Sequence, residues 1–594
     1  MPNIKTRFYN DVDTDHPLNE YPRPQFVRDN WTNLNGYYDY AITSEDETFP
    51  DEYDGKILVP FAIESQLSGV EKTLTPNSRL WYRRTFRVGR EFRGKRALLH
   101  LDAVDWECHV FVNRNLVAFH RGGYTVVTAD ITDSLIKGDN ELIVCVYDPT
   151  DLGWQQKGKQ TLTPSGIYYT ATSGIWQTVW LEAVNKTRIK SIRLTPDIDA
   201  GIIKIQPKVK NAAKYLINTE ISFNGEKIVE TVINGETNIA IPDAKLWSPE
   251  TPNLYDIKLE LVHGGRVVDT VKSYFGMRKF SMEPDDAGIM RLCLNNKPYF
   301  QKGLLDQGYW PDSGMTPPTD EAMIYDIQKM KDLGYNMLRK HIKVEPARWY
   351  YHCDRLGMLV WQDMVSGGEN VSMFYRGVLP NVITALGHYK HIMFKDNKYK
   401  ILRRETKESR DFFEKELFEV IDQLYNTVSI NVWVIFNEAW GQFDSERISR
   451  SVKAYDPTRN VDHASGWYDQ GAGDFKSVHQ YVLRVEMPKD KWKKRRAFVL
   501  SEYGGYSTVC SGHCWNEKKG FGYISYKSKA EISDAYRKLH EEQLIPLIPK
   551  GLSATVYTQV SDVENELNGI MTYDRELVKL DEDVIRDVNR RLSY

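Results

Sequence analysis

The chain changes its hydrophobic pattern once, near residue 280, and this change limits the folds open to it. Before that point, short runs of alternating apolar and polar residues, such as 97–102, 109–113 and 141–147, are separated by Gly, Asp and Asn, with almost no helical periodicity. After it, strand-like runs alternate with amphipathic helical runs. The first pattern is typical of antiparallel sheets, and the second indicates βα units with a parallel sheet.

The strand-only part predicts two β domains. The strand-like run 176–182 leads into a polar segment, so we expect an N-terminal β jelly-roll sandwich over 1–184. Further along, Asn224-Gly225 and Asn234-Gly235 indicate tight hairpin turns, because both residue types tolerate positive φ. About a hundred residues of strands without a helical pattern predict an immunoglobulin-like β-sandwich over 185–280.

The rest of the chain, 281–594, predicts a (β/α)8 TIM barrel. Helical runs such as 321–333 and 410–425 fall between strand-like runs. The predicted strands are 299–305, 336–341, 359–364, 429–436, 461–466, 477–481, 497–501 and 553–559. Eight strands in about 300 residues match a (β/α)8 barrel.

Polar residues gather where these strands end. In a parallel barrel the carboxyl ends of the strands meet at one face, and active sites form there. A charged side chain at the tip of a buried strand is costly unless it faces a solvated pocket, and Glu438 and Glu502 stand at two such tips. Further candidates at strand ends are Asn437, Arg339, His341, Asp363, His479 and Tyr481, and the aromatic residues Trp310, Trp440 and Trp467 lie just beyond strand ends.

Two facing carboxylates can hydrolyse a glycosidic bond. For retention of configuration, one carboxylic acid protonates the leaving oxygen while a carboxylate about 5–5.5 Å away attacks the anomeric carbon. The acid needs a pKa raised by burial or by a neighbouring negative charge, and the nucleophile needs donors that keep it charged. Tyr481 or Arg339 could supply those donors. The residues alone do not assign the two roles between Glu438 and Glu502, and inversion of configuration stays open.

Four motifs occur in the first and third predicted domains. They are 172–182 (TSGIWQTVWLE), 437–442 (NEAWGQ), 501–505 (SEYGG) and 558–575 (TQVSDVENELNGIMTYDR). In this order they resemble the sugar-binding-domain signature, the acid/base motif, the nucleophile motif and the eighth-strand region of glycoside hydrolase family 2. That family includes β-galactosidases, β-glucuronidases and β-mannosidases.

The resemblance implies a jelly roll, an immunoglobulin-like sandwich and a catalytic barrel, and it assigns roles to residues. Glu438 would be the general acid/base and Glu502 the nucleophile. Asn437 would bind the hydroxyl next to the anomeric carbon, and Tyr481 would hydrogen-bond Glu502. The other residues predicted to bind substrate are Arg339, His341, Asp363, His479, Trp440, Trp467 and Trp310.

The substrate expectation is a terminal β-linked sugar of an oligosaccharide or glycoside, released by a retaining, β-galactosidase-like enzyme. In β-glucuronidases the lysine of an Asn-x-Lys motif holds the substrate carboxylate, and the corresponding stretch 568–570 has none, which disfavours glucuronic acid. β-Galactofuranoside, arabinoside, β-glucoside and β-mannoside stay open, because pocket contacts decide among them. A non-catalytic carbohydrate-binding protein is the alternative from another class, and it would not need paired carboxylates.

A loop of the first domain, 148–160, carries Trp154. This loop could reach the active site and place the indole ring on a bound sugar. It could equally form a packing contact between domains, and the sequence leaves both open.

Other classes of function are disfavoured. A net charge of −3, without a dense basic stripe beyond 491–496, argues against nucleic acid. Cys510, His513 and Cys514 could be three zinc ligands, but they lack a fourth ligand at metal-site spacing. The magnesium ligands of large β-galactosidases have no clear match in this sequence. We therefore expect no metal or cofactor. The sequence contains no apolar run of about 18 residues, so it predicts no membrane span. The first residues lack the apolar core of a signal peptide. We expect a cytoplasmic protein, or a periplasmic or secreted one if a leader was removed; a homo-oligomer stays open.

Overall fold

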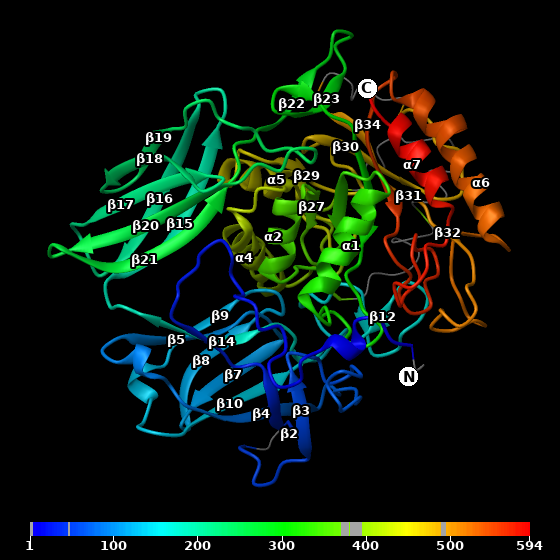
Figure 1. Cartoon of the computed structure of the whole chain (residues 1–594). Helices are drawn as coiled ribbons and strands as arrows, with labels where there is room; N and C mark the ends of the chain where they lie inside the picture. The colour runs from blue at the N-terminus through cyan, green and yellow to red at the C-terminus, as the bar shows by residue number, and fades with distance from the viewer. Residues whose placement is uncertain (1–3, 46–47, 370–378, 380–394, 489–494) are drawn as a thin grey trace.

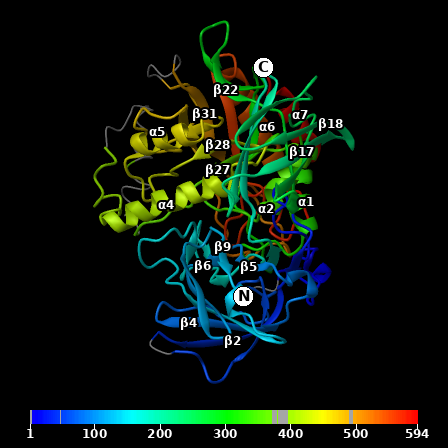
Figure 2. The same ribbon diagram turned by 90° about the vertical axis from the view of Figure 1, so that its left-hand side faces the viewer.

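The computed structural model of this chain describes residues 4–45, 48–369, 379, 395–488 and 495–594, so residues 491–494 of the basic run lie outside it. The first domain lies at the bottom of Figures 1 and 2, with the barrel above it. A second β domain lies beside the barrel at the upper left of Figure 1. The catalytic residues predicted above therefore belong to a barrel that contacts the first domain.

The first domain is an antiparallel sandwich whose sheets have the orders β3-β2-β4-β10-β7-β8 and β1-β14-β5-β9. Its main strands are β1 (Trp31–Asn33), β2 (Gly36–Ser44), β3 (Gly55–Val59), β4 (Ser78–Phe86), β5 (Arg96–Leu101), β7 (Glu107–Val112), β8 (Asn115–Arg121), β9 (Val127–Asp130), β10 (Asn140–Tyr147) and β14 (Val179–Val184). Short elements are η1 (Tyr9–Asp11), η2 (Arg90–Phe92), η3 (Thr132–Ser134), β6 (Val104–Asp105) with β13 (Gly174–Ile175), and β11 (Gln160–Thr161) with β12 (Tyr169–Thr170). In β7 every second residue is buried, the period expected when one face of a strand meets the core.

The second domain is an immunoglobulin-like sandwich of two sheets with the orders β15-β16-β19 and β18-β17-β20-β21. Its strands are β15 (Arg188–Asp197), β16 (Ile202–Lys210), β17 (Leu216–Phe223), β18 (Glu226–Ile233), β19 (Thr237–Ala240), β20 (Tyr255–His263) and β21 (Arg266–Phe275). Asn224 and Gly225 connect β17 to β18, and both have positive φ, as predicted for a tight hairpin turn.

A three-stranded sheet precedes the barrel: β22 (Phe280–Pro284), β23 (Met290–Leu294) and β24 (Lys297–Pro298). Phe280, Leu292 and Leu294 join one hydrophobic cluster with Trp361 and other residues of the barrel strands. This cluster fills the barrel interior below the level of the predicted site, so the interior is a packed core.

The third domain is the predicted (β/α)8 barrel. Its parallel strands are β25 (Gln301–Asp306), β26 (Met337–Lys340), β27 (Leu359–Asp363), β28 (Ile430–Val434), β29 (Asn460–Asp462), β30 (Phe475–Gln480), β31 (Ala497–Gly504) and β34 (Leu552–Thr558). They follow the order β29-β28-β27-β26-β25-β34-β31-β30, and contacts between β29 and β30 nearly close the barrel. Each of the eight predicted strands overlaps one of these, so the predicted fold class is confirmed.

Helices surround this barrel and begin at residues that suit a helix start. They are α1 (Asp320–Asp332), α2 (Ala347–Leu356), α4 (Lys407–Leu424), α5 (Ser445–Tyr455), α6 (Lys529–Leu539) and α7 (Glu582–Arg591). Thr319, Thr406 and Ser528 accept a hydrogen bond from the first turn of α1, α4 and α6, which satisfies backbone donors left open there. Shorter elements are β32 (Tyr506–Ser507), β33 (Ile524–Ser525), η5 (His540–Leu544) and η6 (Ile545–Leu547). Among the helices described, none is both long and apolar enough to cross a bilayer.

Candidate active site

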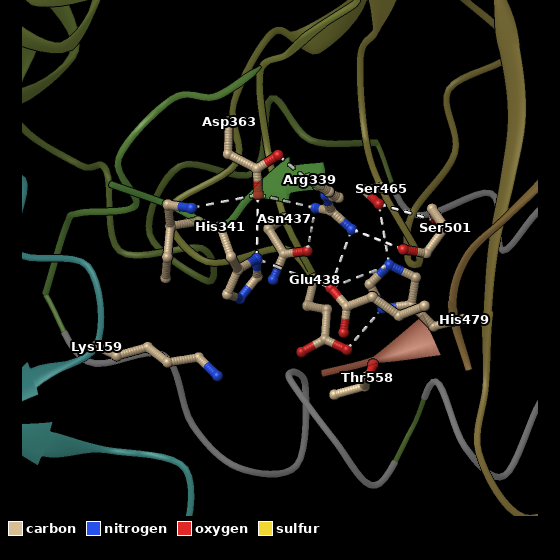
Figure 3. A network of polar contacts seen from close by, with 12 residues as sticks. Lys159, Arg339, His341, Asp363, Asn437, Glu438, Ser465, His479, Ser501 and Thr558 are labelled. Atoms are coloured by element: carbon tan, nitrogen blue, oxygen red, sulfur yellow. Dashed lines mark hydrogen bonds and ion pairs between the residues drawn. The ribbon is translucent and has the colours of Figure 1, made fainter. Parts of the chain in front are cut away.

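Glu438 and Glu502 converge at the carboxyl end of the barrel. Figure 3 shows Glu438 with Arg339, Asn437 and His479 around it. One carboxylate oxygen of each glutamate, together with a ring nitrogen of His479, lie within 4.8 Å of one another. Carboxyl groups about 5–5.5 Å apart are typical of retaining glycosidases, whereas inverting enzymes need about 6.5–9.5 Å to admit a water. The arrangement therefore suits retention better than inversion.

A bulge in β31 turns Glu502 toward the barrel axis. Val478 of β30 pairs with Leu500, but the next residue, His479, pairs with Glu502, so Ser501 is an extra residue in β31. Such bulges re-aim side chains and are frequent beside active sites. The carbonyl of Ser501, the extra residue, accepts a hydrogen bond of 3.1 Å from Arg339 Nη1.

Glu438 sits on a strained turn directly after the extended segment that includes β28. Glu438 and Ala439 have φ of 47° and 63°, a left-handed conformation that residues with a Cβ adopt at a cost. The backbone nitrogen of Glu438 donates to the Ser465 carbonyl at 2.9 Å, which ties this turn to the segment after β29. Backbone strain of this kind clusters at functional sites.

Each oxygen of the Glu502 carboxylate has a donor. Arg339 Nη1 donates to Oε1 at 3.0 Å, and the Tyr481 hydroxyl donates to Oε2. Tyr481 stacks on Tyr523 with ring centroids 3.7 Å apart. Gly505 (φ 64°) permits this stack, because a Cβ there would lie 2.4 Å from the Tyr523 ring. Glycine in the 501–505 motif therefore positions the tyrosine that binds the nucleophile candidate.

Arg339 holds three site residues in one buried network. Its guanidinium makes two bonds of 3.0 Å to Asp363 and one of 2.9 Å to Asn437 Oδ1. Burial alone would lower the pKa of Arg339, but Asp363 and Glu502 outweigh it and raise the pKa. A permanently charged, forked donor thus fixes the positions of Asp363, Asn437 and Glu502 together.

His341 lies next to this network as a neutral imidazole. Its Nδ1 is 3.1 Å from Asp363 Oδ2 and 4.0 Å from Glu502 Oε1. Burial, reinforced by the positive charge of Lys159, holds the pKa of His341 well below its usual range. The ring can therefore exchange hydrogen bonds without adding charge.

His479 lies between the two glutamates. Its Nδ1 is 2.8 Å from Glu438 Oε1, and its Nε2 is 2.9 Å from Ser465 Oγ and 3.5 Å from Glu502 Oε1. Gly466 (φ 87°) makes room for the ring, because a Cβ there would lie 2.7 Å from it. Burial would raise the pKa of Glu438, but the contact with His479 prevails and lowers it. That His479 binds substrate stays a prediction; its contacts described here are with Ser465 and with the two glutamates.

The three predicted aromatic residues lie in different surroundings. Trp467 packs obliquely on His479 with ring centroids 5.6 Å apart, and Trp440 stacks on Tyr168 at 5.5 Å. Trp310 lies under Arg575, 4.0 Å from the ring centroid, and none of its described ring contacts is with the glutamates. That these three bind sugar stays a prediction.

The loop 148–160 of the first domain does reach the barrel. The backbone nitrogens of Lys157 and Gly158 both donate to the Ser366 carbonyl at 2.9 Å, just beyond β27. The Trp154 ring meets Trp106 edge-on at 5.9 Å and Phe412 at 5.5 Å. Because Phe412 belongs to α4, these contacts join the two domains, which is the second of the two roles left open for Trp154.

Lys159, at the end of the same loop, extends toward Glu438 (Figure 3). Nothing in the sequence distinguishes it from Lys157, because loop lysines are normally solvated. Tyr523, which supports Tyr481, also carries no sequence signal, since it lies between short elements of a long connection. Both residues enter the site through contacts that only the folded chain creates.

One group of side chains in the described residues could hold a metal ion: Glu438, His479 and Glu502. Arg339 and Tyr481 already donate to both oxygens of Glu502, and His479 contacts Glu438. This donor set suits acid–base chemistry without a resident cation. Outside that group, His513 Nδ1 lies 2.6 Å from Asp574 Oδ2 and Cys514 faces the Cys510 carbonyl, and the described part of the chain gathers no ligand set there.

Comparison with protein families gives matches along most of the chain. The glycosyl hydrolases family 2 sugar binding domain matches residues 27–184. A second model of glycosyl hydrolases family 2 matches 187–278, and the family's TIM barrel domain matches 289–579.

Curated proteins with similar sequences include two β-galactosidases. The one from Pseudoalteromonas haloplanktis is 23% identical over 559 residues, which cover 83% of this chain and 50% of that protein. The one from Thermoanaerobacter pseudethanolicus is 25% identical over 373 residues, 58% of this chain and 47% of that protein. The chain spans about half the length of the curated relatives it matches.

Solved structures share the whole architecture. A β-galacturonidase from Eisenbergiella tayi bound to galacturonate has a TM-score of 0.70 at 18% identity, covering 96% of this chain and 99% of that one. A Bifidobacterium dentium β-glucuronidase complexed with coumarin-3-O-glucuronide has a TM-score of 0.72 at 17% identity, covering 96% and 98%. At these identities the likeness shows the fold alone.

Proposed function

This chain belongs to glycosyl hydrolase family 2, and from that premise we propose that it is a retaining exo-β-glycosidase that releases terminal β-linked galactose. The observation that carries the proposal is the convergence of Glu438 and Glu502, with one oxygen of each within 4.8 Å of the other. The β-galactosidase names of two relatives support galactose as the sugar.

In the first step, Glu502 acts as the nucleophile. One of its oxygens forms a bond to the anomeric carbon while the bond to the leaving oxygen breaks with its electron pair. Glu438 gives its proton to that oxygen. Arg339 and Tyr481 donate to the Glu502 carboxylate and so hold it oriented before the attack.

In the second step, the direction of proton transfer reverses. Glu438, now a carboxylate, takes a proton from a water molecule, the water oxygen bonds to the anomeric carbon, and Glu502 leaves. The contact with His479 lowers the pKa of Glu438 and favours this ionised form, while burial favours the protonated form of the first step. The two opposing influences suit a group that must act as acid and then as base.

Asn437 would bind the sugar near its reacting centre, and Arg339 would orient Asn437. Arg339 donates to Asn437 Oδ1 at 2.9 Å, which fixes the orientation of the amide. The amide nitrogen would then donate to the hydroxyl next to the anomeric carbon. This contact can strengthen in the transition state, as it does for the 2-hydroxyl in many glycosidases.

The test measures which sugar is released and in which configuration. A panel of 4-nitrophenyl glycosides, including galactoside, glucoside, mannoside, galactofuranoside, arabinoside and glucuronide, should give its highest kcat/KM with the β-galactoside. Proton NMR of the first-formed sugar should show the β-anomer. An initial α-anomer would contradict retention, and binding without hydrolysis of any glycoside would favour the carbohydrate-binding alternative.

A further inference from the structure

The first domain directs the charged side chain of Lys159 toward Glu438 (Figure 3), and its charge acts on that carboxyl group. Lys159 is only 5% exposed. Its loop is held against the barrel, and Gly158 (φ 61°) lies so close that a Cβ there would be 3.0 Å from the Ile342 carbonyl. Ile342 follows His341, so this anchor brings Lys159 to the predicted substrate subsite. Backbone contacts between the loop and the barrel therefore fix the position of the Lys159 ammonium.

The described contacts of the Lys159 ammonium are long. Its Nζ is 3.5 Å from the Tyr169 hydroxyl and 3.8 Å from Glu566 Oε2. An ammonium has three N–H donors, and a buried cation without short hydrogen bonds is costly. These long contacts leave N–H donors of Lys159 available to an oxygen of a ligand, or to water in its place.

Glu566, the acidic neighbour of Lys159, is held by the protein on both oxygens. Tyr169 donates to Oε2, and Asn568 Nδ2 donates to Oε1 at 3.0 Å. Glu566 comes from the segment after β34, so the Lys159–Glu566 pair joins the first domain to the barrel. The pair is electrically neutral as a unit.

The neutral pair decides which sugar group it can bind. A sugar carboxylate bound by Lys159 would also lie near the Glu566 carboxylate. Two negative charges that lie close together in a buried site repel each other strongly. A sugar hydroxyl can accept from Lys159 and donate toward Glu566, which satisfies both partners. The pair therefore matches a hydroxyl better than a carboxylate.

We propose that Lys159 and Glu566 together bind the 4- or 6-hydroxyl of the terminal sugar, away from its anomeric carbon, which makes this a site for neutral sugars. The inference rests on the proposed function, because it takes Glu438 and Glu502 to mark the anomeric carbon. Asn437 and Tyr481 would lie near the anomeric carbon of the sugar, whereas Lys159 approaches the sugar from the first domain. The rival is a uronide, the substrate class named for two proteins that share this fold.

The experiment uses 4-nitrophenyl glycosides that differ at one position. The β-D-galactoside, β-D-fucoside, α-L-arabinopyranoside and β-D-galacturonide carry CH2OH, CH3, H and a carboxylate on the same carbon, and the β-D-glucoside inverts the 4-hydroxyl. We would measure kcat/KM with the wild-type chain, Lys159→Met, Lys159→Arg and Glu566→Gln. Lys157→Met is the matched control from the same loop, because Lys157 Nζ donates to the Asp151 carbonyl.

We expect Lys159→Met to lower kcat/KM on the galactoside by about 10- to 100-fold, the usual worth of a hydrogen bond to a charged group. The loss should be much smaller on the fucoside and the arabinopyranoside if Lys159 binds the 6-hydroxyl, and on the glucoside if it binds the axial 4-hydroxyl. Lys157→Met should leave kcat/KM unchanged on every substrate. Lys159→Arg keeps the charge and should lose less than Lys159→Met. The wild-type chain should cleave the galacturonide at least about 100-fold less efficiently than the galactoside.

Two results would overturn the inference while leaving the retaining glycosidase mechanism intact. One is a wild-type preference for the galacturonide that Lys159→Met abolishes, which would make Lys159 a carboxylate-binding residue. The other is an equal loss on every substrate, which would make Lys159 a link between domains. The wild-type comparison across substrates needs no variant, so it holds even if Lys159→Met does not fold. Hydrolysis of none of the series would instead contradict the proposed function and remove the premise of the inference.

Discussion

The barrel mouth and the interface between the barrel and the first domain both bury carboxyl groups, but the two regions treat their charge differently. At the mouth, Arg339 and His479 face the carboxylates, and the pKa of Glu438 is lowered despite burial. At the interface, burial prevails and raises the pKa of Glu416 and of Glu564 to about 7. The neighbours differ between the two regions, and the Glu438 side chain is also more exposed, at 16%, than Glu416 or Glu564.

The hydrogen-bond donors to Glu416 and Glu564 at the interface are neutral. Glu416 of α4 accepts from the Gln156 amide at 2.5 Å, and Glu564 accepts from the Thr170 backbone nitrogen at 2.8 Å. Neutral donors offset only part of the cost of burying a charge, whereas a guanidinium offsets far more. Charge at the barrel mouth is thus maintained by specific cationic and imidazole partners, as expected where ionised carboxylates must react.

Removing the nucleophile should have the largest effect. Glu502→Gln keeps the size of the side chain but cannot attack the anomeric carbon, so we expect kcat to fall by about 10⁴-fold or more. Substrate affinity should change much less. Initial rates on 4-nitrophenyl β-galactoside, with thermal unfolding to confirm folding, would measure this. Activity within 10-fold of the wild type would remove Glu502 from the nucleophile role.

Removing the acid/base should have an effect that depends on the leaving group. Glu438→Gln should lower kcat/KM by about 10²- to 10⁴-fold for methyl β-galactoside, which needs a proton, and far less for 2,4-dinitrophenyl β-galactoside, which does not. Azide should restore turnover of the activated substrate and yield a β-glycosyl azide. Equal losses on both substrates would argue that Glu438 does not donate the proton.

The barrel and the positions of its site residues could largely be predicted from the sequence. The eight barrel strands and the position of Glu438 and Glu502 at strand ends follow from hydrophobic patterning, because the barrel topology brings all such ends to one face. Arg339 and Asp363 were selected in the same way, and they do meet in the site. Strand ends are predictable since they depend on local periodicity.

The partners that set the charge of each carboxylate could not be predicted. The contact of His479 with Glu438 depends on a one-residue bulge at Ser501 and on the space above Gly466, and neither has a sequence signal. Lys159 arrives from another domain, and Trp154, the more conspicuous residue of that loop, packs against Trp106 and Phe412. Contacts between distant segments decide these points.

His479→Asn should raise the pKa of Glu438 and so make this carboxyl group more like those at the interface. It removes the contact that lowers the pKa of Glu438 and leaves the burial that raises it, so this pKa should rise. The alkaline limb of the kcat/KM profile reports loss of the acid proton and should move to higher pH, while the rate at the optimum falls about 10-fold. His540→Asn, which removes a buried imidazole bonded to Tyr503, is the control and should leave the limb in place. A limb that moves to lower pH would instead show that His479 holds the acid proton.

Glu416→Gln tests the interface and should have the smallest effect. An acid whose pKa is raised from 4.5 when unfolded to about 7 when folded stabilises the fold fully below pH 4.5, and this stabilisation is lost as the pH rises to about 7. Glutamine does not ionise, so the variant should gain stability relative to the wild type between pH 5 and 7, by on the order of 1–3 kcal/mol, and no further above pH 7.

Thermal unfolding of both proteins at pH 5, 6, 7 and 8 measures the difference in Tm that this ionisation causes. Glu446→Gln on α5 is the control, because that side chain is 53% exposed and should give a difference that does not vary with pH. A constant difference for Glu416→Gln as well would mean that Glu416 stays charged at the interface. In that case neutral donors would suffice to hold a buried carboxylate, and the role assigned to Arg339 and His479 at the barrel mouth would lose its physical basis.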